Sequence, residues 1–129
     1  MIKFFIKDIR NCKYFRATDE TILCELLHPK NENEDLKIDF SVAHAILKVG
    51  ESSLKHKLNS SVEIYYILDG KGIISINNEE EEVNTGQLIY IPANSKQYLK
   101  NNGNTELRFL CIVYPMWREE DEKLIKKED

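Results

Sequence analysis

The fold of this chain can be inferred from two segments. Residues 50–70 read GESSLKHKLNSSVEIYYILDG, and residues 86–101 read GQLIYIPANSKQYLKN. In both, short runs rich in Ile, Leu and Tyr stand between turn-forming residues, which is typical of β-strands. The first stretch places His56 and Glu63 beside such runs, and the second places Gln97 there. These polar side chains next to apolar strands are the first candidates for a functional site.

The same pattern of short apolar runs and turn residues continues along the rest of the chain. No segment before residue 116 combines helical periodicity with capping residues. Short strands separated by frequent turns favour a sandwich or barrel over alternating strands and helices. Strands are expected near 21–26, 39–48, 54–57, 62–68, 71–76, 81–84, 87–91, 96–101 and 106–114.

The two stretches resemble the two-motif signature of the cupin family. In that family the first motif is G, five residues, HxH, three or four residues, E, six residues, G. The second is G, five residues, PxG, two residues, H, three residues, N. Every spacing fits this sequence. The identities match at Gly50, His56, Glu63, Gly70, Gly86, Pro92 and Asn101.

This resemblance implies an all-β fold, a cupin-type double-stranded β-helix or jelly-roll barrel with a short C-terminal helix or tail. The chain has 129 residues, which suits one domain of ordinary size. We therefore expect a single cupin domain over 1–129, with the motif-bearing barrel at about 41–114. Strands in 1–40 precede the barrel, and the charged tail 116–129 forms a short surface helix or a frayed end.

The sequence departs from the family pattern at three positions. Leu58 replaces the second histidine of HxH, Asn94 the second glycine of PxG, and Gln97 the histidine of the second motif. In the family, those two histidines join the residues matching His56 and Glu63 in holding a divalent metal. The resemblance therefore leaves His56, Glu63 and Gln97 as a thinned metal site. One imidazole, one carboxylate and one amide oxygen do not rank Zn, Mn, Fe and Ni as the ion.

Strand alternation extends the site to neighbouring positions. Side chains two residues apart share one face of a strand, so the neighbours of His56, Glu63 and Gln97 at that spacing point the same way. If this face points into a barrel, it forms a mostly apolar pocket with a few polar groups, as small-ligand sites do. His44 lies on a neighbouring expected strand, and the pattern leaves its face open. The predicted pocket residues are Leu58, Tyr65, Ile67, Leu99 and His44.

Two kinds of function remain open. The resemblance implies lyase, isomerase, decarboxylase or dioxygenase chemistry on a small polar molecule such as a sugar or organic acid. Glu63 and His56 are the predicted catalytic residues, either beside a metal that polarises substrate oxygens or as a metal-free acid–base pair. The alternative is a cupin without a metal that binds or senses a ligand and does no catalysis. The loss of two histidines favours this second hypothesis.

Composition limits the partners and the compartment. A net charge of −4 and an isoelectric point near 5.5 argue against a general nucleic-acid binder. The sequence has no apolar run of membrane-spanning or signal-peptide length. Three cysteines without a CxxC pair suit the cytoplasm. Cupin barrels are often dimeric, and the apolar segments MIKFFI and TILCELL predict a homodimer.

Overall fold

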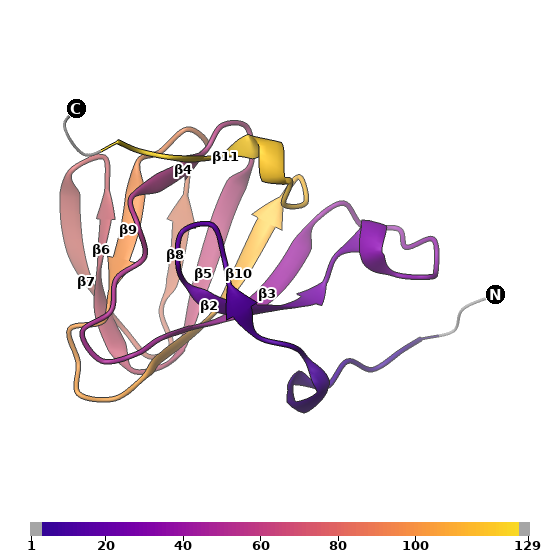
Figure 1. Ribbon diagram of the computed structural model, residues 1–129, viewed down its shortest axis with the longest axis horizontal. Helices are drawn as coiled ribbons and strands as arrows, with labels where there is room; N and C mark the ends of the chain where they lie inside the picture. Colours follow the sequence, from indigo (N-terminus) through magenta and orange to yellow (C-terminus); the bar gives the residue numbers. More distant parts are fainter. Residues whose placement is uncertain (1–3, 127–129) are drawn as a thin grey trace.

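The computed structural model describes residues 4–126, and antiparallel β-strands are its main regular structure (Figure 1). Predictions for residues 1–3 and 127–129 lie outside the described residues. Three short 3-10 helices interrupt the strands: η1 (Ile9–Asn11), η2 (Pro29–Asn31) and η3 (Glu119–Asp121). The strands are β1 (Phe15–Arg16), β2 (Ile22–Leu27), β3 (Ser41–Leu47), β4 (His56–Leu58), β5 (Val62–Asp69), β6 (Lys71–Ile76), β7 (Glu79–Asn84), β8 (Leu88–Ile91), β9 (Gln97–Lys100), β10 (Leu107–Tyr114) and β11 (Glu122–Leu124).

The strands form two antiparallel sheets, which confirms the expected all-β barrel architecture. One sheet has the order β1-β2-β3-β10-β5-β8, and the other has the order β11-β4-β9-β6-β7. Each sequence motif gives one strand to each sheet, because β4 and β5 come from the first motif and β8 and β9 from the second. β5 pairs with β8 in one sheet, and β4 pairs with β9 in the other. The polar residues of both motifs are therefore brought to the interior between the sheets.

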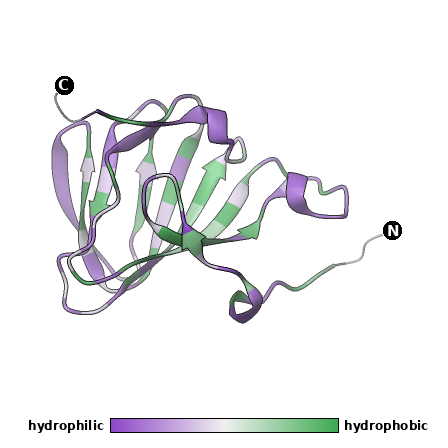
Figure 2. Cartoon of the chain, viewed as in Figure 1, coloured by the Kyte–Doolittle hydropathy of each residue, from purple (hydrophilic) through white to green (hydrophobic). Residues whose placement is uncertain are grey.

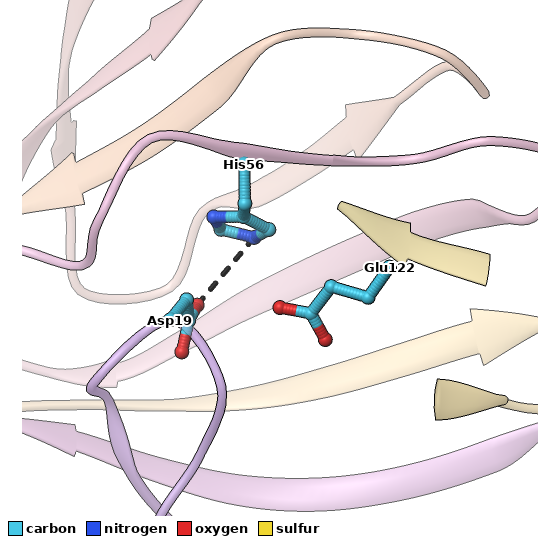
Figure 3. A group of neighbouring side chains, drawn as sticks. All are labelled: Asp19, His56 and Glu122. Atoms are coloured by element: carbon cyan, nitrogen blue, oxygen red, sulfur yellow. Dashed lines mark ion pairs between the residues drawn. The ribbon is translucent and has the colours of Figure 1, made fainter. Parts of the chain in front are cut away.

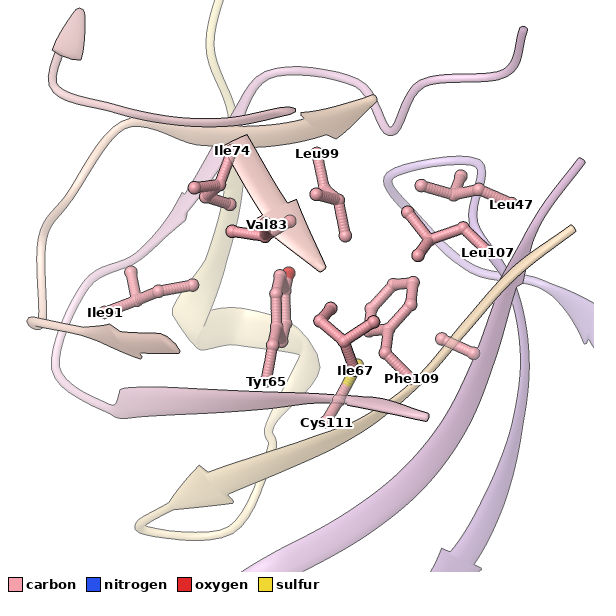
Figure 4. Close-up of a cluster of buried hydrophobic side chains, with 11 residues drawn as sticks. Leu47, Tyr65, Ile67, Ile74, Val83, Ile91, Leu99, Leu107, Phe109 and Cys111 are labelled. Atoms are coloured by element: carbon pink, nitrogen blue, oxygen red, sulfur yellow. The ribbon is translucent and has the colours of Figure 1, made fainter. Parts of the chain in front are cut away.

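Alternate residues of the strands fill this interior. In β10 the buried positions alternate with more exposed ones along the whole strand, which is the pattern of a sheet with one face in the core. The rings of Tyr65 and Phe109 contact each other at a centroid distance of 4.9 Å. Figure 4 shows the resulting cluster of Ala45, Leu47, Tyr65, Ile67, Ile74, Val83, Ile91, Leu99, Leu107, Phe109 and Cys111.

The structure explains why the first motif ends in a glycine. Gly70 has a φ of +91°, in the left-handed region that favours glycine. A Cβ atom at this position would lie 2.6 Å from the carbonyl oxygen of Glu106. The turn between β5 and β6 therefore depends on glycine for both its backbone conformation and its space.

The acidic run Glu79–Glu82 lies on a strand, directly after a hairpin turn. The turn is formed by Asn77 and Asn78, both with positive φ, and the run belongs to β7 at the edge of the five-stranded sheet. Figure 2 shows β7 as hydrophilic, in contrast to the apolar strands of the other sheet. Charged side chains on an edge strand discourage its pairing with other chains.

The C-terminal tail is bound to the barrel. The short helix that was expected there is η3, and the strand β11 that follows it pairs with β4. The carboxylate of Asp121 accepts hydrogen bonds from the backbone N–H groups of Ser60 and Ser61, at 2.9 and 3.1 Å. The tail thus places the next residue, Glu122, beside the barrel interior, which the sequence pattern did not indicate.

Candidate functional site

A cavity of about 200 Å³ opens between the sheets. Its walls come from β2, β3, β4, β5 and β10, from the segment around residues 15–21, and from the C-terminal segment that holds Trp117 and Glu122. Tyr65, Phe109 and Cys111 belong to both the cavity wall and the hydrophobic core. The ionisable residues that line it are Arg16, Asp19, Glu25, His56, Glu63, Tyr65, Cys111 and Glu122.

His56 is buried at the start of β4, with 3% of its surface exposed. Its Nδ1–H donates a hydrogen bond of 2.7 Å to the carbonyl oxygen of Leu54. Because a carbonyl oxygen can only accept, this bond fixes the proton on Nδ1 and leaves the lone pair of neutral imidazole on Nε2. Nε2 lies 3.4 Å from Oδ2 of Asp19. A backbone acceptor on one ring nitrogen is the usual way in which a metal-binding histidine is oriented.

Asp19 reaches the cavity from the turn that joins β1 to β2. Its Oδ1 accepts a hydrogen bond of 3.1 Å from the N–H of Thr21, inside the same turn. Its backbone carbonyl accepts a 2.7 Å hydrogen bond from the N–H of Leu54. Leu54 therefore anchors both Asp19 and His56, and the second carboxylate oxygen of Asp19 is left facing the imidazole.

Glu122 enters from the opposite side, at the start of β11. Its Oε1 accepts a hydrogen bond of 2.8 Å from the indole Nε1–H of Trp117. Burial raises the pKa of Glu122, while the Trp117 hydrogen bond and the nearby His56 work against this rise. Asp19, His56 and Glu122 each offer one metal-ligand atom, and these three atoms lie within 4.8 Å of one another. Figure 3 shows the three side chains converging from separate segments.

Glu63 has a buried carboxylate with an unused acceptor. Only 8% of its surface is exposed, and its Oε1 has no hydrogen-bond partner among residues 4–126. Burial raises the pKa of Glu63 to about 7, and the nearby carboxylates of Asp19 and Glu122 add to this rise while His56 opposes it. Buried polar oxygens without a partner are rare in folded proteins, because each costs the free energy of its lost hydration.

Gln97 lies beside His56 in the sheet, since β4 and β9 pair through these two residues. The hydroxyl of Tyr65 donates a hydrogen bond of 3.1 Å to Oε1 of Gln97. The amide oxygen of the predicted metal set therefore accepts this hydrogen bond, and Gln97 is not one of the residues lining the cavity. Leu58 offers no donor. Of the predicted metal set, His56 and Glu63 line the cavity, and the carboxylates of Asp19 and Glu122 line it with them.

The predicted pocket residues separate into three groups. Leu58 and Tyr65 line the cavity. Ile67 and Leu99 are fully buried in the hydrophobic core and do not reach it. His44 does not line the cavity either; its Nδ1 forms a 2.7 Å hydrogen bond with the hydroxyl of Tyr14. Burial lowers the pKa of His44.

Sequence reasoning missed Asp19 and Glu122. Asp19 stands in a stretch typical of a turn, and Glu122 stands in a charged tail whose composition predicts a solvated surface. Neither residue belongs to a motif. The sequence around a carboxylate in an irregular segment does not indicate where its side chain will point. Only the tertiary structure therefore brings these two residues to His56.

Comparison with known proteins identifies the family to which this chain belongs. The cupin domain family matches residues 43–113, and the chain belongs to this family. An uncharacterized protein of Methanocaldococcus jannaschii, MJ1618, is 40% identical over 114 residues, which is 88% of this chain and 89% of that protein. The oxalate-binding protein of Thermotoga maritima is 33% identical over 67 residues, or 52% of this chain and 55% of that protein.

Solved structures share the fold. A predicted oxalate decarboxylase from Thermotoga maritima superposes with a TM-score of 0.73 at 23% identity, over 84% of this chain and 97% of that one. Pac13 of Streptomyces, a nucleoside dehydratase, superposes with a TM-score of 0.73 at 17% identity, over 96% of this chain and 92% of that one. At these identities the likeness concerns the barrel alone.

Proposed function

We propose that this protein binds a small, neutral, hydroxyl-rich molecule such as a sugar inside the barrel, together with one divalent metal ion. The observation that carries the proposal is the free Oε1 of Glu63, which is buried in the cavity wall without a partner. A ligand that donates a hydrogen bond to this oxygen would remove the cost of burying it. The cavity is large enough for a small organic molecule only.

The charges of the cavity favour a neutral ligand over an organic acid. Asp19, Glu63 and Glu122 are acceptors when ionised, and they face the same space. The guanidinium of Arg16, which also lines the cavity, is paired at 3.0 Å with the carboxylate of Glu51 outside it. When all three are ionised, these carboxylates outweigh the charge of one divalent ion, so an oxalate dianion would still be repelled, although the Thermotoga relative named above binds oxalate. Hydroxyl groups meet no such repulsion.

The proposed chemistry is proton transfer of the lyase or isomerase type. Glu63 presents its free oxygen to the ligand and is placed to accept a proton from a hydroxyl or an activated carbon. A bound metal supplies Lewis-acid polarisation of a ligand oxygen. His56 offers Nε2 toward the ion, and Gln97 positions Tyr65 in the cavity wall. The alternative of a binding or sensing protein without metal is decided by the same experiment.

The test combines metal analysis with ligand binding. Protein purified without chelators is expected to carry about one equivalent of a divalent metal. Its melting temperature should rise with neutral sugars or polyols and not with oxalate. Glu63→Gln should abolish the sugar response, whereas Glu79→Gln, on the exposed edge strand, should leave it unchanged. Stabilisation by oxalate alone would contradict the ligand class, and sugar binding by metal-free protein would favour the alternative.

We also propose a homodimer. Tyr66, Leu68, Leu88 and Tyr90 expose between 38% and 61% of their surface on neighbouring strands β5 and β8. An exposed apolar patch on the face of a sheet supports contact with a second copy. Light scattering at micromolar concentration should give twice the chain mass, and Leu88→Lys should shift it to the monomer. A monomeric wild type would contradict the proposal.

We also propose that the protein is located in the cytoplasm. The cysteines Cys12, Cys24 and Cys111 are free thiols, as expected in a reducing compartment. No helix among residues 4–126 is long and apolar enough to cross a membrane.

A further inference from the structure

We propose that the divalent ion is held by Asp19, Nε2 of His56 and Glu122, so that it ties the turn at 17–21 and strand β11 to the barrel. The inference rests on the metal of the proposed function and assigns its ligands. Two of the three lie outside both sequence motifs, in segments that precede and follow the motif-bearing part of the chain.

The geometry of the three donors is close to what a small ion requires. Nε2 of His56 and Oδ2 of Asp19 are 3.4 Å apart, which one ion at about 2.1 Å from each atom can bridge. All three ligand atoms lie within 4.8 Å of one another, so a side-chain shift of about half an ångström brings every pair within reach of one ion. His56 is oriented by its Nδ1–H bond to Leu54, and Asp19 by its bond from Thr21. Glu122 keeps one oxygen on the indole of Trp117 and has the other available. Each ligand is thus held by a neighbouring group that does not compete for the ion.

The free oxygen of Glu63 is the independent sign that something occupies this space. It is more than nine-tenths buried, has no partner among the described residues, and lines the same cavity as the three donors. Arg16 is the one Lys or Arg side chain among the described residues that line the cavity, and it is paired with Glu51. Three carboxylates without a cation repel one another in a site of low dielectric constant. A divalent ion removes this repulsion, and a water or ligand hydroxyl bound to it can donate to Glu63.

The donor set indicates the kind of ion. One imidazole nitrogen and two carboxylate oxygens suit first-row ions such as Mn²⁺, Fe²⁺ and Zn²⁺, and no thiolate in the cluster selects a softer metal. Three protein ligands leave coordination positions for water or substrate.

The two outer ligands give the ion a structural effect. Asp19 sits in a turn between two strands at the edge of a sheet, and Glu122 sits on a strand of three residues. An ion bound by both couples these segments, so removing either ligand weakens the hold on the other. This reciprocity distinguishes a shared ion from two unrelated carboxylates.

Calorimetric titration of chelator-treated protein with MnCl₂ and with ZnCl₂ tests the assignment. Asp19→Asn and Glu122→Gln are each expected to weaken binding at least about tenfold. Glu20→Gln and Glu120→Gln, which change exposed glutamates one and two residues from the two ligands, should bind within twofold of wild type. Asp19→Asn retains an amide oxygen to accept from Thr21, so the turn should fold as before, and melting curves of the metal-free variants check this.

Hydrogen exchange supplies a second readout that does not depend on activity. Mn²⁺ should protect the amides of both 17–21 and 122–124 in wild type, and Glu122→Gln should lose the protection at 17–21. If Mn²⁺ binds wild type and both ligand variants equally, the assignment is wrong and the metal of the proposed function still stands. If neither ion binds wild type, both this ligand assignment and the metal of the proposed function are wrong. Sugar binding is tested separately, by melting temperature.

Discussion

Replacing Asp121 with alanine should destabilise the protein strongly, although this residue lies in a charged tail. Asp121 is 5% exposed. Its carboxylate accepts hydrogen bonds from the backbone N–H and the hydroxyl of Ser60, at 2.9 and 2.7 Å, and from the backbone N–H of Ser61, at 3.1 Å. The guanidinium of Arg118 lies 3.3 Å away. These contacts join the C-terminal segment to the loop between β4 and β5.

The magnitude follows from what alanine leaves behind. A hydrogen bond to a charged group contributes about 1.5–3 kcal/mol, and a buried donor left without an acceptor costs about 1–3 kcal/mol. Ser61 is 2% exposed, so its N–H cannot be rehydrated without local opening. The Ser60 groups are nearer the surface and should recover part of their loss to water. Because such terms are not additive, we expect a loss of about 3 kcal/mol in the free energy of unfolding.

Urea unfolding followed by circular dichroism measures this loss directly. For a chain of 129 residues it corresponds to a fall of about 10 °C in melting temperature. Glu120→Ala is the matched control, because this side chain in the same short helix is 74% exposed and 3.9 Å from Arg118. It should change stability by less than about 0.5 kcal/mol. An Asp121→Ala loss below about 1 kcal/mol would refute the view that this carboxylate anchors the tail.

Three further predictions concern pH, a turn and the core. Burial raises the pKa of Asp121 but the hydrogen bonds from Ser60 and Ser61 outweigh it, so the folded pKa is lowered. Its stabilisation is full above the unfolded pKa of about 3.9 and is lost as the pH falls through the folded value. The difference in urea midpoint between wild type and Asp121→Asn should therefore shrink from pH 7 to pH 3, and a constant difference would contradict this. Gly70→Ala should lower the melting temperature more than Gly86→Ala. Both residues have φ near +90°, so the backbone strain is similar, but only at Gly70 would the new Cβ meet a backbone atom, at 2.6 Å. Equal melting temperatures for the two variants would contradict the clash. Phe109→Ala should cost about 3–5 kcal/mol in urea unfolding, because its ring is buried against Tyr65; a loss below about 1 kcal/mol would show that the core closes around the gap.

The sheet architecture could be predicted because its signals are local. Turn residues and alternating apolar positions act within a few residues of each other, so strands such as β5 and β10 are visible in the sequence. The spacing of Gly50, His56, Glu63 and Gly70 added the family and therefore the barrel fold. Two strands were not predicted, β1 and β11. Both are short and depend on their partner strands more than on their own composition.

Whether a side chain points into the barrel could be predicted only where another residue of the same strand already indicated which face of the strand points inward. His56 and Glu63 were expected in the interior together with Leu58 and Tyr65, and the structure places all four around the cavity. Ile67 shares the inward face of Glu63, but it lies further along β5, in the dry part of the barrel. Alternation gives the face of a side chain and does not give its depth along the barrel.

The barrel, the family, and the imidazole and carboxylate that the motifs bring inside it can all be inferred from local sequence patterns. The groups that surround them become clear only in the folded chain. Asp19 and Glu122 reach His56 because a turn from one end of the chain and a strand from the other close on the same cavity. Such convergence depends on long-range packing, since neither segment has a periodic pattern that would fix where its carboxylate points.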